Sequence, residues 1–231
     1  MVQILQAETI TLQELITLYG LQFVESEEFF LEWQSNLPEL TELEKQLLDQ
    51  VKAGYINLRN YPPLLENTVN TAVLSTLLFI GKFYLPPFHI KLEKSVEIAT
   101  EDKDTVIKGR IDCLLLNQQF WVTVIESKQV AYSVEAGLDQ ILAYMLAYPQ
   151  SQEQVFGMIT SGGSFMFIKL VKSLPPRYAT SDIFDIRNRG NELYNVLSIL
   201  KHLSERVLLG LDRQDAYPTR NVNSFEIVSK W

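Results

Sequence analysis

Apolar positions in the first sixty residues recur every three or four positions, which is the spacing of one face of an α-helix. The segments with this pattern are 11–20, 26–33 and 38–53. Thr11 and Glu14 have the spacing of a capping box, so we expect the first helix to begin at Thr11. Gly54 follows the third segment and is expected to end it. These patterns predict that residues 1–60 form a helical extension packed on the core of the protein.

A further helix is expected to begin at Pro62 and Pro63, because proline is tolerated in the first helical turn. Around the axis of this helix, with Leu65 at 0° and 100° per residue, the apolar side chains lie between about 40° and about 120°. These are Val69, Val73, Leu77 and Ile80. Glu66 lies at about 100°, inside the apolar stripe. A carboxylate that faces the protein needs a partner, which makes Glu66 a candidate functional residue. The alternative is that it caps a backbone group or pairs with a lysine.

After Pro86 and Pro87 the pattern changes to short apolar runs typical of β-strands. The expected strands are 88–99, 106–116, 120–128, 155–160 and 165–171. The expected helices in this part of the chain are 133–148 and 190–209. Residues 211–231 are expected to form an irregular tail. The order of elements predicts a mixed α/β sheet flanked by helices on both faces, with the main core in residues 61–210.

Composition is typical of a globular protein. The chain has 231 residues, 47% hydrophobic and 21% charged, enough for a substantial core. Apolar runs stay well short of the roughly 18 residues that span a bilayer, so we expect no membrane partner. The first residues lack the basic head and apolar core of an export signal. The single cysteine, Cys113, cannot form an intrachain disulfide, so we expect a cytoplasmic protein.

The net charge of −8 argues against nucleic acid as a partner until its distribution is considered. Residues 1–79 contain eleven acidic and three basic side chains, which accounts for the whole −8. The remaining 152 residues hold 17 of each sign. The acidic N-terminal part would repel a polyanion, while the balanced part can still present a basic groove.

The stretch GRIDCLLLNQQFWVTVIESKQ, residues 109–129, places three charges in or beside two apolar strands. Alternation puts Glu126 and Lys128 on one face of the second strand. A hairpin folded about its short polar turn brings Asp112 opposite Ile125 or Glu126, depending on the register. We therefore expect Asp112 and Glu126 to lie close together.

Two adjacent carboxylates repel each other, and a divalent cation relieves the conflict. Carboxylate oxygens suit Mg²⁺ or Mn²⁺, and a bound ion lowers the pKa of its water. Lys128 could hold the attacking hydroxide or stabilise the charge that develops on a phosphodiester. The alternative is structural: Asp112 pairs with Arg110 or Lys108, and Glu126 with Lys128 forms an ordinary salt bridge.

These residues resemble the PD-(D/E)xK nuclease superfamily, whose motif has an acid at the end of one strand and (D/E)xK on the next. Asp112 and Glu126-Ser127-Lys128 match that motif. The resemblance implies a restriction-endonuclease-like fold with Asp112 and Glu126 as metal ligands. Ser127 would contribute only its backbone carbonyl to the metal. The superfamily usually has a further acid on the preceding helix, and Glu66 matches it.

The exonuclease-like branch of that superfamily carries Gln-x-x-x-Tyr on the next helix, and Gln140 and Tyr144 match it. A spacing of four places both on one helical face, where the resemblance implies contact with substrate or support for Lys128. An ordinary structural role is the alternative for both residues.

Over most of its length the chain also resembles small cyanobacterial proteins labelled restriction endonuclease subunit R. The likeness lies in stretches such as YPPLLENTV, GRIDCLLL, VIESKQ and EAGLDQILAYMLAYP. Ile111 replaces the proline of the motif, a common departure in the superfamily. The sequence has no GxxxxGK[ST] run, so translocation coupled to ATP hydrolysis is not implied.

The resemblance implies a Mg²⁺-dependent nuclease, with Mn²⁺ as a substitute, that hydrolyses DNA in restriction or defence. A homodimer is a further expectation, because many such nucleases pair to cut two strands. The competing hypothesis is a catalytically silent nuclease-like module in a restriction or defence complex. In that case the acidic N-terminal helices would dock a partner protein.

Overall fold

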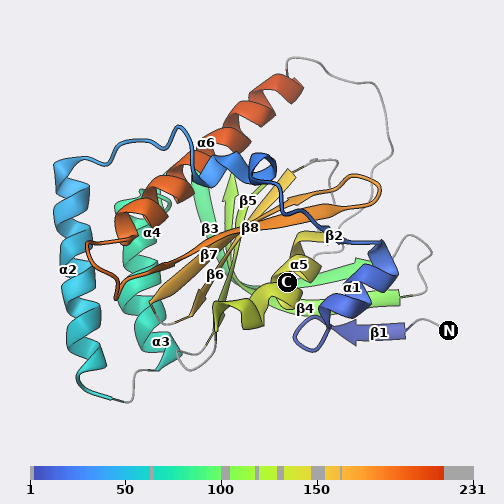
Figure 1. Ribbon diagram of the computed structural model, residues 1–231, viewed down its shortest axis with the longest axis horizontal. Coiled ribbons are helices and arrows are strands. Elements are labelled where there is room, and N and C mark those ends of the chain that lie inside the picture. The colour runs from blue at the N-terminus through green and yellow to red at the C-terminus, as the bar shows by residue number, and fades with distance from the viewer. Residues whose placement is uncertain are drawn as a thin grey trace.

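The computed structural model describes residues 3–62, 65–99, 105–117, 120–128, 133–146, 154–161 and 163–215 (Figure 1). The strands are β1 (Gln3–Gln6), β2 (Gln22–Phe23), β3 (Phe88–Ala99), β4 (Thr105–Asn117), β5 (Phe120–Lys128), β6 (Gln154–Ser161), β7 (Ser164–Val171) and β8 (Arg177–Asp185). The α-helices are α1 (Leu12–Tyr19), α2 (Glu42–Arg59), α3 (Glu66–Val69), α4 (Thr76–Ile80), α5 (Leu138–Leu146) and α6 (Leu193–Asp215). A π-helical segment, η2 (Asn70–Ser75), joins α3 to α4, and η1 (Glu27–Trp33) and η3 (Val134–Gly137) are 3₁₀ helices.

The described strands form one mixed sheet in the order β1-β4-β5-β6-β7-β8-β2, and β3 also pairs with β4. The β3-β4, β4-β5, β6-β7 and β7-β8 pairs are antiparallel. The β5-β6 pair is parallel, and η3 and α5 lie between these two strands in the chain. A crossover helix is the usual connection between parallel neighbours. The mixed α/β architecture expected from the sequence is therefore confirmed.

Each face of the sheet carries its own hydrophobic core, as expected for a sheet covered by helices on both faces. What we call the α6 core packs α2, α4 and α6 against one face and includes Leu48, Leu77 and Leu197. The α5 core packs α1 and α5 against the other face and includes Leu15 and Tyr144. Figure 1 shows these two groups of helices on opposite sides of the strands. The sheet thus separates two helical layers, and α5 belongs to only one of them.

Local signals in the sequence correctly located several elements. Thr11 caps α1 and forms the expected capping box with Glu14. Strand β3 has the expected bounds, and β4 and β5 match theirs within one residue. Strands β6 and β7 form the expected hairpin, with Ser161 paired to Ser164. Ser133 caps a 3₁₀ turn that leads into α5. The part of that helix expected at 147–148 lies outside the described residues.

Several expected boundaries were wrong, and packing explains one of them. Gly54 does not end α2, which continues to Arg59 because Tyr55 is buried in the α6 core beyond it. Pro62 is not helical, and the next described helix begins at Glu66 after the extended N-cap residue Leu65. Helix α6 continues past Gly210 to Asp215. Residues 216–231 lie outside the described part of the chain.

Three strands were not expected from the sequence, and two of them lie in the N-terminal sixty residues. Strand β1 pairs in parallel with the first half of β4. Strand β2 pairs in parallel with the start of β8, the third unexpected strand. Residues 1–60 thus supply strands at two places in the sheet as well as helices. Very short strands give too little alternation to be recognised in a sequence.

Hydropathy gives no membrane-spanning candidate among the helices that the structure describes: none combines sufficient length with sufficient apolar character.

Candidate functional site

The register between β4 and β5 decides how Asp112 and Glu126 are placed. Cys113 pairs with Ile125 and Leu114 with Val124, so continuing the register by one residue sets Asp112 opposite Glu126. An irregularity between Leu115 and Leu116 shifts the pairing by one residue. Without that shift Asp112 would lie opposite Ile125. Directly opposed residues have Cβ atoms about 4.5–5.5 Å apart, so this register suits two carboxylates that share a ligand.

Burial shows which face of the sheet Glu126 occupies. Leu114 packs in the α5 core, whereas Cys113 and Ile125 pack in the α6 core. Counted from Ile125, alternation places Glu126 on the face covered by α5, while Asp112 lies between neighbours that pack in opposite cores, Ile111 and Cys113. Glu126 is only 2% exposed, and Asp112 is partly buried. A buried carboxylate is costly, and binding of a cation is one way to offset that cost.

Strand β4 changes its neighbour close to Asp112. Its first half, 105–108, pairs with β1, and its second half, 113–117, pairs with β5. The change from one neighbour to the other therefore falls between Lys108 and Cys113. Ile111 packs in the α5 core, as Leu114 does, although simple alternation would put them on opposite faces. The strand is therefore irregular where Asp112 lies, and such irregularities often re-aim a side chain at a functional site.

Helix α5 is hydrogen-bonded to β4 between its pairings with β1 and β5. The Tyr144 hydroxyl donates to the backbone carbonyl of Arg110 at 3.0 Å. The Gln140 side chain donates from Nε2 to the Tyr144 oxygen at 2.8 Å. Both side chains are buried, Tyr144 completely. These residues therefore connect α5 to the backbone of β4 two residues before Asp112.

Electrostatics also relates α5 to the predicted site. Burial raises the pKa of Tyr144 well above its ordinary value of 10, and the negative charge of Glu126 raises it further. Tyr144 is consequently a neutral hydrogen-bond donor at physiological pH, and it lies near enough to sense Glu126. In this structure Gln140 and Tyr144 position the backbone beside the site.

Cys113 behaves as the buried apolar residue that its position predicts. It is 3% exposed in the α6 core. Burial raises the pKa of its thiol to about 12, and the negative charge of Asp112 adds to the effect. The thiol is therefore protonated and unsuited to metal binding or nucleophilic attack.

The structure describes the backbone of the (D/E)xK motif, but the side chains of Ser127 and Lys128 lie outside the described part. Ser127 pairs with Thr160 and Lys128 with Ser161, at the carboxyl ends of the parallel strands β5 and β6. This end of a parallel strand pair is a common location for ligand sites in α/β proteins. The role of Lys128 stays a prediction.

Glu66 is partly buried at the first residue of α3. The apolar stripe expected on this helix is buried, whereas Leu65 is 60% exposed. The π-helical segment makes the residue count per turn larger than the 3.6 assumed in the sequence analysis. Helix α3 leads towards α4, which packs in the α6 core on the face of the sheet opposite α5. A metal ion bound by Glu66 together with Asp112 and Glu126 would therefore have to reach Glu66 past the edge of the sheet. That convergence stays a prediction.

Carboxylate oxygens of Asp112 and Glu126 fit Mg²⁺ or Mn²⁺ by ligand chemistry. Among the residues that the structure describes, no group of three or more His, Cys, Asp or Glu is placed to hold a metal ion. Two protein carboxylates leave several positions to water and substrate, as is usual for Mg²⁺. The donor set at this site therefore fits such an ion with substrate phosphate as a further ligand.

A buried lysine on β7, Lys169, has a structural role. Lys169 is 8% exposed, and its Nζ donates to Glu32 Oε1 at 2.6 Å and to the Phe29 carbonyl at 2.9 Å. The ammonium group also lies 5.4 Å from the centre of the Phe29 ring. Lys169 thus fastens η1 to β7. Its position on a strand with otherwise apolar neighbours was the only sequence signal for this role.

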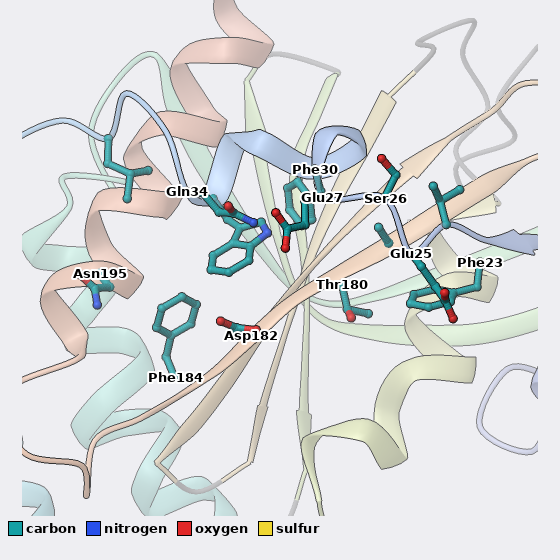
Figure 2. Close-up of a pocket in the computed structure, with 14 residues that line it drawn as sticks. Phe23, Glu25, Ser26, Glu27, Phe30, Gln34, Thr180, Asp182, Phe184 and Asn195 are labelled. Carbon is teal, nitrogen blue, oxygen red and sulfur yellow. The ribbon is translucent and has the colours of Figure 1, made fainter.

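A cavity far from the charged hairpin in sequence was missed altogether. It has a volume of about 560 Å³ and lies between the segment after β2, strand β8 and the start of α6 (Figure 2). Aromatic and acidic side chains line it together, among them Trp33, Phe184, Glu27 and Asp182. The sequence signal was the alternation of acids and aromatics in VESEEFFLEW, which we interpreted only as a packing stripe.

The chain was compared with known proteins. No protein-family model matches it, and a search of the curated proteins gives no match.

Proposed function

We propose that the protein is a Mg²⁺-dependent nuclease of the restriction-endonuclease-like fold that hydrolyses phosphodiester bonds in DNA. The observation that carries this proposal is the register of β4 and β5: its last pair on this side is Cys113 with Ile125, and continued by one residue it would bring Asp112 opposite Glu126. Support comes from Gln140 and Tyr144 on α5, whose hydrogen bonds end on the Arg110 carbonyl two residues before Asp112.

Each candidate residue would have its own role in the reaction. Asp112 and Glu126 would hold the divalent ion, with Glu66 as a further ligand and the Ser127 carbonyl available beside them. Such an ion supplies an activated water and neutralises charge on the scissile phosphate. Lys128 would orient the attacking hydroxide and stabilise negative charge on the phosphoryl oxygens. Gln140 and Tyr144 would keep the backbone before Asp112 in place.

Cleavage assays on linear, circular and single-stranded DNA with Mg²⁺ or Mn²⁺ test this function. We expect Asp112→Asn, Glu126→Gln and Lys128→Ala each to lower metal-dependent cleavage by at least about a hundredfold, because each removes a group that acts in the transition state. The first two substitutions keep the side-chain size and remove only the charge. If all three variants cut DNA at the parental rate, the assignment fails.

A matched control for the carboxylate variants is Glu93→Gln. Glu93 lies on β3 and its exposed carboxylate forms an ion pair with Arg110 at 3.5 Å. It is near the site in the sheet but has no proposed catalytic role, so its variant should cleave normally. Circular dichroism and thermal unfolding of every variant separate loss of activity from loss of structure.

A second candidate function is a catalytically silent module of a restriction or defence complex. The observation that favours it is the acidic cavity of Figure 2, which lies away from the charged hairpin. Calorimetric titration with Mn²⁺ separates the two functions. The nuclease should bind Mn²⁺ at micromolar to millimolar levels and lose that binding in Glu126→Gln, whereas a silent module need not bind the ion.

A further inference from the structure

The cavity of Figure 2 arises because the edge strand β2 is very short. Strand β2 pairs with β8 only at Arg177 and Tyr178. The chain then leaves the sheet and continues as η1, which contacts both β8 and α6. The cavity borders the part of β8 beyond that pairing, where its lining includes Thr180 and Asp182.

The cavity has aromatic walls. Phe23 and Trp33 come from the N-terminal segment, and Phe184 comes from β8. Trp33 and Phe184 meet edge to face, with ring centroids 6.0 Å apart. The faces of aromatic rings carry partial negative charge and attract ammonium and guanidinium groups.

Three carboxylates add to this negative character. Glu25, Glu27 and Asp182 line the cavity and are exposed to solvent, and no basic residue is among the described lining residues. In Figure 2, Glu27 and Asp182 belong to different walls, one on η1 and the other on β8. The arrangement complements a cation and repels nucleic acid.

The wall formed by η1 is held in place before any ligand binds. The Lys169 ammonium group binds Glu32 and the Phe29 carbonyl, both within η1. Beyond η1, Ser198 on α6 donates to the carbonyl of Pro38 at 3.0 Å. A wall held in place in this way loses little conformational entropy on binding, which favours affinity.

Large aromatic side chains are accessible in the lining of the cavity. Phe23 is 53% exposed, and Trp33 in the same lining is half-buried. Protein interfaces usually have aromatic side chains at their centre and a polar rim around them. A small inorganic or organic cation would leave these side chains uncovered, whereas a polypeptide would cover them.

We propose that this cavity is a docking site for a partner protein that inserts an arginine or lysine side chain between the aromatic walls and the carboxylates of Glu27 and Asp182. The flanking residues of the partner segment cover Phe23 and Trp33. This interaction does not depend on the proposed nuclease activity, because none of these residues belongs to the charged hairpin.

Labelled peptides of sequence Thr-Val-Xaa-Val-Thr, with Arg, Lys, Gln or Glu at Xaa, test the proposal on the full chain. Fluorescence anisotropy measures affinity, and heteronuclear NMR follows the indole signal of Trp33. We expect the Arg and Lys peptides to bind saturably and shift that signal, and the Gln peptide to bind at least roughly tenfold more weakly. The Glu27→Gln, Asp182→Asn double variant should lose roughly tenfold in affinity for the Arg peptide.

The matched control is Glu28→Gln, because Glu28 is exposed on η1 beside Glu27 but does not line the cavity. This variant should bind the Arg peptide as the parent does. The proposal is overturned if the Arg peptide does not bind, if the Arg and Glu peptides bind equally, or if Glu28→Gln loses as much affinity as the double variant. Spermidine that binds as tightly as the Arg peptide would identify a small polyamine site and would also overturn it.

Discussion

At Tyr144 a single hydroxyl group connects α5 to the backbone of β4. It donates to the Arg110 carbonyl and accepts from Gln140 inside a completely buried environment. The sequence offered two interpretations of this pair, a substrate contact and an ordinary structural position. The hydrogen bonds favour a positioning role, because they end on the backbone before Asp112. A residue of this kind affects both stability and the geometry of the site.

We expect Tyr144→Phe to lower the free energy of unfolding by about 1–3 kcal/mol, because it removes a buried hydroxyl that is hydrogen-bonded to the Arg110 carbonyl and the Gln140 amide. Urea denaturation followed by circular dichroism measures the change. Tyr194→Phe is the control, since the Tyr194 hydroxyl binds the exposed carboxylate of Asp49. The control should change stability by less than about 1 kcal/mol. Equal effects of the two substitutions would contradict the role assigned to Tyr144.

At the scale of elements, the same capping motif begins two helices, in one case exposed to solvent and in the other buried. Both α1 and α2 begin with a capping box, formed by Thr11 with Glu14 and by Thr41 with Glu44. In α1 the motif is exposed. In α2 the Glu44 carboxylate is buried and also pairs with Lys201 on α6. The second motif therefore fixes the orientation of two helices as well as one helix end.

The Glu44 contacts predict a pH-dependent contribution to stability. Burial raises the pKa of Glu44, but hydrogen bonds from Lys201 and Thr41 and the charge of Lys201 outweigh it and hold the pKa below its ordinary value of 4.5. Because the folded state favours the charged form, its contribution is fully present above pH 4.5 and is lost as pH falls through the lower folded pKa.

We expect Glu44→Ala to cost about 1–2 kcal/mol of unfolding free energy at neutral pH, with the difference from the parent shrinking as the medium is acidified. Chemical denaturation at a series of pH values provides the measurement. Glu14→Ala removes the same motif from α1 without a lysine partner on another helix, and a smaller loss is expected there. A Glu44 effect that stays constant into strong acid would refute the argument.

At the scale of the whole molecule, the N-terminal segment is built into both edges of the structure. Strand β1 pairs with β4 and β2 with β8. Between them, Ile10, Leu15 and Leu21 are buried in the α5 core. The same segment continues into the acidic cavity. The N-terminal residues thus complete the sheet, one hydrophobic core and the proposed docking surface.

Removal of residues 1–24 is expected to prevent stable folding. Each large apolar side chain lost from a core costs about 2–5 kcal/mol, and several such losses exceed the usual total stability of about 5–15 kcal/mol. Size-exclusion chromatography and thermal unfolding would show aggregation or a missing cooperative transition. In the full chain, Leu15→Ala should destabilise strongly, while Ile4→Ala should not, because Ile4 is 57% exposed. A truncated chain with the parental unfolding midpoint would contradict this prediction.

Much of the fold was predictable because it depends on local patterns. The apolar runs of β3, β4 and β5 and the SGGS turn between β6 and β7 each carry a signal within a few residues. The strand β8 and the short strands β1 and β2 were missed. Short edge strands are specified by the neighbour they pair with, and that neighbour is remote in sequence.

The candidate site was predictable in part for the same reason. Sequence indicated that Asp112 and Glu126 lie on adjacent strands, but left two registers open. The irregularity at Leu115 and Leu116 chose between them, and no local pattern marked it. The role of Lys169 and the acidic cavity were beyond sequence reasoning, because they join residues about 140 positions apart, such as Lys169 and Glu32 at a separation of 137.

By itself the sequence determined the class of the sheet, the position of the charged hairpin and the cap of α1, because spacing and hydrogen bonding among near neighbours fix these features. Only the tertiary structure decided the register that pairs Cys113 with Ile125, the layer to which each helix belongs, and the cavity between η1 and β8. These features depend on burial and pairing between segments that are distant in sequence, and such contacts form only when the chain folds.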